Sequence, residues 1–159
     1  MIWGSRFGLV ALLVSLSASG MAQSPGGGLP MDRVFQGQVR LPDFAGRDRK
    51  YANFHTRIRA GMSTGPDFAG HYAVVQIGCG TECTFAFVGD VATGQVYDFP
   101  YGGEQYRQMQ IIRSAKSNDL KVVWIANGRC NRDWLTWNGA SFTSVARLDL
   151  GPSEFCERL

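Results

Sequence analysis

The sequence is poor in charge, and it has no long apolar run beyond its first 22 residues. Charged residues make up 18% of the 159 residues, and 16 Lys and Arg stand against 13 Asp and Glu. This mild balance does not build a polyanion-binding surface, so we expect no nucleic-acid partner. A membrane helix needs about 20 apolar residues, so we expect no membrane span in the chain after residue 22.

Histidine and cysteine are too few and too scattered to predict a metal site. The chain has two histidines and four cysteines, namely His55, His71, Cys79, Cys83, Cys130 and Cys156. Zinc sites use four Cys or His ligands, and here Cys79 and Cys83 form the only close pair. The C-x-x-C motif of thioredoxin-type proteins is absent, because three residues separate Cys79 from Cys83. We therefore expect no metal and no cofactor.

The first 22 residues have the composition of a secretory signal peptide. Arg6 is their only charge, the run FGLVALLVSLSASG follows it, and the small residues Gly20 and Ala22 precede Gln23 at the −3 and −1 positions. We expect cleavage near Ala22–Gln23 and a periplasmic or secreted protein, most simply one exported by a bacterium. Cleavage would leave 137 residues, which suits one domain, and would lower the net charge from +3 to +2.

All four cysteines follow the predicted cleavage site, and disulfides form in the compartments to which exported proteins go. Four cysteines allow three pairings, and the sequence does not choose between them. We favour Cys79–Cys83 with Cys130–Cys156, because the second bridge would fasten a C-terminal tail that has little else to hold it. The chain-entropy model gives the short loop about 2 kcal/mol and the longer loop about 3.5 kcal/mol.

Pattern and composition divide the mature chain into a lead-in and one disulfide-stabilised β domain. Residues 23–32 are rich in Gly and Pro and predict a flexible lead-in, and the domain is expected over residues 33–159. Alternation over residues 33–41 is compatible with a first strand. An amphipathic helix is predicted over roughly residues 48–61, because apolar residues there fall three or four apart.

The remaining chain reads as strands joined by short turns. Strands are predicted at 71–78, 84–91, 95–100, 108–114, 120–127, 133–137 and 141–148. No connection after residue 70 is long enough for a crossover helix, so the sheet should be antiparallel. The predicted fold class is mainly β (α+β), an antiparallel sheet or small barrel or sandwich of about seven or eight strands with one N-terminal amphipathic helix.

The stretch GHYAVVQIGCGTEC, residues 70–83, has three interpretations: a Cys–His catalytic pair, a metal site, or a strapped turn. His71 and Cys79 would lie about 26 Å apart along one extended strand, which is too far for a catalytic pair. A free thiol is also exposed to oxidation outside the cytoplasm. We favour a disulfide-strapped corner in which Thr81 and Glu82 point outward.

Two later segments combine aromatic and charged residues in the way that binding surfaces do. They are PYGGEQYRQ, residues 100–108, and NGRCNRDWLTW, residues 127–137; core packing is the competing interpretation. Taken with the corner, the candidate binding residues are His71, Tyr72, Thr81, Glu82, Tyr101, Tyr106, Arg107, Arg129 and Arg132.

The motifs GPDFAGHYAVVQIGCGTEC and DVATGQVYDFP resemble those of a group of small exported bacterial proteins of uncharacterised function. That group has a helix, a GPNFAGHY-like segment, a GCGxxC corner and a TGxVY hairpin. The resemblance covers roughly residues 50–100 and thins out afterwards, and Asp67 stands where the group usually has asparagine. It implies export and a shared β core, and it transfers no catalytic residue.

These observations favour an exported, non-enzymatic binding module that uses loops at one end of a β domain. Its partner would be an envelope protein or a glycan. The alternative is a cell-envelope hydrolase in which His71 acts with Glu82 or with a free Cys83. A third class, a structural subunit of an envelope assembly, would show a large exposed apolar patch. Whether Cys79 and Cys83 are bonded distinguishes the first two hypotheses.

Overall fold

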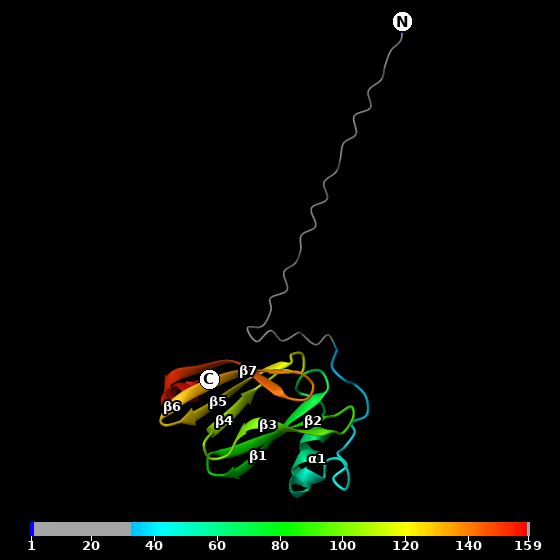
Figure 1. The fold of residues 1–159 in the computed structure, drawn as a ribbon, viewed down its shortest axis with the longest axis horizontal. Helices are drawn as coiled ribbons and strands as arrows, with labels where there is room; N and C mark the ends of the chain where they lie inside the picture. Colours follow the sequence, from blue (N-terminus) through cyan, green and yellow to red (C-terminus); the bar gives the residue numbers. More distant parts are fainter. Residues whose placement is uncertain (2–32, 159) are drawn as a thin grey trace.

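The computed structural model describes residue 1 and residues 33–158 of the chain, and it is mainly β (Figure 1). Seven antiparallel strands form two sheets. The first sheet has the order β1-β2-β3, which are Tyr72–Gly80, Cys83–Asp90 and Val96–Gly102. The second has the order β4-β5-β6-β7, which are Arg107–Ile112, Asp119–Ala126, Arg129–Trp137 and Phe142–Pro152. The predicted fold class is confirmed, as a sandwich with no closed barrel. The predicted signal peptide and lead-in lie outside the described residues.

The predicted helix is present, but it begins as a 3-10 helix. This turn, η1, covers Arg49–Phe54 and leads into α1, His55–Ser63. Asp48 precedes η1 without capping it, because its carboxylate accepts hydrogen bonds from the backbone N–H of Val96 at 3.0 Å and of Asp43 at 3.2 Å. Asp48 therefore ties the start of the helical region to β3.

The predicted first strand over residues 33–41 is wrong, because this segment has no strand partner along its length. It makes two backbone hydrogen bonds to residues that flank the first sheet, from Phe35 N to Gly70 O and from Arg40 N to Val91 O, both 2.8 Å. Gly70 precedes β1 and Val91 follows β2, so the segment runs past the ends of two neighbouring strands. Alternation alone could not show this, since the partners lie far along the chain.

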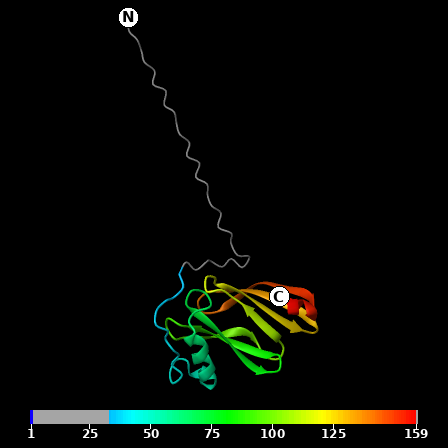
Figure 2. The same cartoon turned by 180° about the vertical axis from the view of Figure 1, so that it is seen from behind.

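Two large apolar clusters of the described residues hold the layers together. The larger fills the space between the two sheets and includes Phe68, Tyr72, Val88, Leu120, Val122, Leu135 and Trp137. The second lies between α1 and the outer face of the first sheet (Figure 2), where Ile58 and Met62 are fully buried. Helix and sheet approach closely at Gly61, since a Cβ there would meet the side chain of Val75 at 2.7 Å. No helix in the described part of the chain is long and apolar enough to cross a membrane.

The connections gather at two opposite ends of the sandwich. One end, the corner end, carries the β1–β2 corner, the β3–β4 loop at 103–106, the β5–β6 turn at 127–128 and the C-terminal 3-10 turn η2, Ser153–Arg158. Hydrogen bonds from Gly103 N to Thr84 O and from Gln108 N to Glu82 O, both 3.0 Å, join the first two. The other end, the His71 end, carries residues 64–71, 91–95, 113–118 and 138–141.

Candidate binding site at the corner end

The corner is strapped by a disulfide between Cys79 and Cys83, with their Cα atoms 5.1 Å apart. Cys79 is exposed and Cys83 is buried. Gly80 has a φ of +140°, a conformation that glycine adopts without a Cβ clash and that lets the ring close. Cys130 and Cys156 form the second bridge, so the favoured pairing is the one in the structure, and no free cysteine remains among the described residues.

Glu82 ties the corner to the second sheet. Its carboxylate accepts hydrogen bonds from the Arg107 guanidinium, with Nε at 2.8 Å, and from the Gln108 side-chain amide at 2.7 Å. The Arg107 bonds, and then the Gln108 bond, lower the pKa of Glu82. This carboxylate is occupied by a cross-sheet ion pair, so acting together with His71, as in the hydrolase hypothesis, would require it to give up Arg107.

A cleft of about 580 Å³ lies between the strapped corner and the β3–β4 loop. Its walls include both cysteines of the corner and the rings of Phe85, Phe87, Phe99 and Tyr106. Gly102 shapes this cleft, because a Cβ there would meet the Cβ of Phe85 at 2.6 Å, so only glycine lets β3 end against β2. We call this hollow the corner cleft.

Tyr101 lines the corner cleft, but its hydroxyl is already bonded within the protein and does not point to a ligand. It is 5% exposed, and its hydroxyl donates to the Asp133 carboxylate and accepts from Arg147. Ser144 donates to both carboxylate oxygens of Asp133 at 2.8 Å. Burial, followed by the bond to Asp133, raises the pKa of Tyr101 to about 12. This network joins β3, β6 and β7 across the sandwich.

This network was not predicted, although the sequence carries one signal for Asp133. In β6, Asp133 shares a face with Leu135 and Trp137, which are buried in the core between the sheets. A carboxylate on the apolar face of a strand must find partners, because burying it alone is costly. Those partners come from residues 32 positions before it and 14 after it in the chain.

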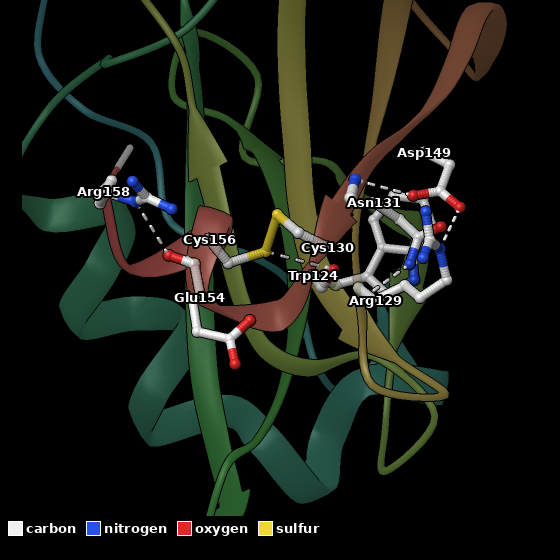
Figure 3. The surroundings of a disulfide bond; sticks show 9 residues. Trp124, Arg129, Cys130, Asn131, Asp149, Glu154, Cys156 and Arg158 are labelled. Atoms are coloured by element: carbon white, nitrogen blue, oxygen red, sulfur yellow. Dashed lines mark hydrogen bonds and ion pairs between the residues drawn. A yellow bond between two sulfur atoms is a disulfide. The ribbon is translucent and has the colours of Figure 1, made fainter.

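Arg129 and Arg132 lie on strand β6 and not in a loop as expected. Asn127 and Gly128, with φ of +53° and +71°, make a two-residue turn that lets β6 begin at Arg129. Figure 3 shows Arg129 paired with Asp149 of β7, close to the bridge that joins β6 to η2. Asp149 raises the pKa of Arg129, and Arg129 lowers that of Asp149.

His71 and Tyr72 lie at the opposite end of the sandwich from the corner. Strand β1 has nine residues, so about 26 Å separates its two ends. His71 Nε2 is 3.8 Å from the Asp90 carboxylate, and the Thr93 hydroxyl donates to the same carboxylate at 2.8 Å. Tyr72 is buried beneath the His71 ring, with centroids 4.2 Å apart.

The structure therefore divides the candidate residues into two groups. Five of them, Thr81, Glu82, Tyr106, Arg107 and Arg129, belong to the corner end. Tyr101 is buried beside it, Arg132 lies further along β6, and the remaining two lie at the His71 end. The pairing of His71 with Glu82 or with a free Cys83 is wrong, because Cys83 is bonded and both residues lie at the far end of β1.

Within residues 33–158, no group of three or more His, Cys, Asp or Glu side chains could hold a metal ion. Comparison of the chain with family models, with curated proteins and with solved structures returned no match. The resemblance to small exported bacterial proteins therefore stays a prediction.

Proposed function

We propose that this protein is an exported envelope protein that acts as a binding module through the corner end of its sandwich, with an envelope protein or a glycan as its partner. The observation that carries the proposal is that three connections and the corner cleft meet at the end where both disulfides lie. Binding groups are commonly displayed on loops that a rigid scaffold positions. Here one disulfide straps the β1–β2 corner, and the other joins η2 to β6.

The closed bridges also support export. Disulfides persist in extracellular and periplasmic compartments and are rare in the cytoplasm, and two of them are compatible with such a location. In the proposal the predicted signal peptide directs the chain there and is removed before Gln23. Mass spectrometry of the exported protein tests this part, since the mature chain should begin at Gln23; a mature chain that retains residues 1–22 would contradict it.

Site-specific photocrosslinking in the exporting cell tests the binding surface. A photoreactive residue is placed at Glu104 or Thr81, on the corner end, or at Lys116, on the His71 end as the matched control. The proposal predicts one recurring adduct from the first two positions and none from Lys116. Adducts that form from Lys116 and not from the corner positions would contradict it.

The alternative hydrolase retains one supporting observation, the pair of His71 and Asp90. A buried carboxylate beside a half-exposed histidine is an arrangement that general-base catalysis uses. A screen of the purified protein against cell-wall glycan and peptide substrates, with His71→Ala as the control, tests it. Turnover that disappears in His71→Ala would support the hydrolase and would count against the binding module.

A further inference from the structure

The corner cleft has a charge opposite to that of the chain that carries it. The whole sequence has a net charge of +3, yet the charged side chains that line the cleft are Asp98 and Glu104, with no Lys or Arg among the described residues there. No described residue bonds to the Glu104 side chain, which is exposed on the β3–β4 loop. An acidic hollow on a basic protein selects for a ligand of positive charge.

Asp98 is partly engaged but remains reachable. Lys50 of η1 donates to it at 2.7 Å, and both side chains are more than 60% exposed. Ion pairs with this exposure contribute little, since water and salt screen them. An incoming cation can therefore share or replace Lys50 at this carboxylate.

The aromatic residues of the cleft indicate which kind of cation fits. Phe87, Phe99 and Tyr101 are at least nine-tenths buried and form apolar walls, while Phe85 and Tyr106 are half-buried at the opening. A lysine or arginine side chain has an apolar stem and a charged tip, and such stems lie along apolar surface while the tip reaches polar groups. A volume of about 580 Å³ holds more than one such side chain.

We infer that the corner cleft binds an extended peptide segment bearing lysine or arginine side chains, whose charged ends reach Asp98 and Glu104. The inference rests on the proposed function and names the chemistry of its ligand. The partner is then a protein with an exposed basic segment, and a glycan would not take its place at this site.

The probe is a capped hexapeptide of alternating lysine and alanine, titrated into the full mature protein. Calorimetry gives its affinity, and backbone amide chemical shifts locate it. Its twin, acetylated on every lysine, has the same length without the charge. A glucosamine oligomer of similar charge represents an amino sugar.

The inference predicts shift changes at residues 79–83 and 98–106. Acetylation, or the double variant Asp98→Asn with Glu104→Gln, should weaken binding at least about tenfold. The matched control is Asp43→Asn with Asp67→Asn, which also removes two carboxylate charges but from residues outside the corner end and its cleft. It should leave the affinity unchanged.

Other results would overturn the inference in distinguishable ways. Equal binding of the acetylated twin at the corner, or tighter binding of the glucosamine oligomer there, would reject a basic peptide and leave the proposed function standing. Shift changes confined to residues 64–71 and 113–118 would reject both. No binding of the lysine peptide would reject the inference alone, because the crosslinking experiment judges the function separately.

Discussion

The two ends of the sandwich are held together by different forces. Both disulfides lie at the corner end, where the Cys79–Cys83 strap and the bridge to η2 close the connections. The His71 end has none, and it relies on packed rings, among them Tyr72, Trp137 and Phe142. Backbone bonds from Ala69 to Ser117 and from Gly70 to Ala115 add to it, at 3.1 and 2.7 Å.

This contrast shows where covalent bonds are added to packing. Aromatic side chains at the His71 end bury one another, so the apolar core continues to the tips of the strands. At the corner end Tyr101, Tyr106 and Trp124 also pack on one another, but the loops beyond them are exposed and the cleft beside them stays open. The Cys79–Cys83 strap fixes one wall of this cleft, and the Cys130–Cys156 bridge fastens η2 to β6 at the same end of the sandwich.

The largest expected effect comes from removing packing at the His71 end. Trp137→Ala should lower the free energy of unfolding by about 4 kcal/mol, because Trp137 is 3% exposed and contacts three other aromatic rings. Urea denaturation followed by circular dichroism measures this. A loss below about 1 kcal/mol would mean that packing does not hold this end.

Removing the Cys130–Cys156 bridge should have the next largest effect. The double variant to serine releases a loop with a sequence separation of 26, which the chain-entropy model values at about 3.5 kcal/mol. Urea denaturation without reductant gives the difference in stability. Because this variant already lacks the bridge, reductant should cause no further loss of stability from that bridge. A variant as stable as the wild type would contradict the structural role of the bridge.

Removing the Cys79–Cys83 strap should cost less. Its sequence separation is 4, so the double variant to serine should lose about 2 kcal/mol. We expect the two double variants to add, because the bridges lie on different sheets. A strap variant less stable than the Cys130–Cys156 variant would reverse the proposed ranking.

Tyr101→Phe should lower stability at neutral pH by about 1.5 kcal/mol, because it removes a hydrogen bond to the buried Asp133 carboxylate. The pKa of Tyr101 is raised to about 12, above the value near 10 expected in the unfolded chain. The folded state therefore holds this proton longer, and stability falls as the pH rises from about 10 to about 12. Stability measured against pH should fall less steeply in the variant over that range, and an unchanged slope would contradict the assignment.

The smallest expected effect concerns the exposed ion pair of Glu82 and Arg107. Since Arg107 lowers the pKa of Glu82, the pair contributes above the unfolded value of about 4.3 and is lost as the pH falls through the lower folded value. Glu82→Gln should remove part of the acid-dependent loss of stability. Glu157→Gln is the control and should lose stability with falling pH as the wild type does. If Glu82→Gln and the control lost stability equally, the ion pair would not contribute to the stability of the fold.

The fold was predictable where the relevant signals are local. The helical region and the hairpins follow from periodicity and turn residues, and the redox compartment predicts that the cysteines are bonded, although it does not choose their pairing. The meeting of the corner with the β3–β4 loop follows from strand direction. The fate of residues 33–41 and the Asp133 network did not follow, because backbone and side-chain partners far along the chain decide them. For the same reason Tyr101 and Tyr72 were expected on a surface, and the structure buries both.

The central claim is that the corner end is a preformed binding end kept in shape by its covalent bridges. Hydrogen exchange of backbone amides in the wild type and in the Cys79→Ser, Cys83→Ser variant tests it most directly. The account predicts faster exchange at residues 78–84 and, through Glu82 and Arg107, at residues 103–108, with no change at residues 64–71. Exchange that is unchanged at the corner, or equally faster at both ends, would contradict it.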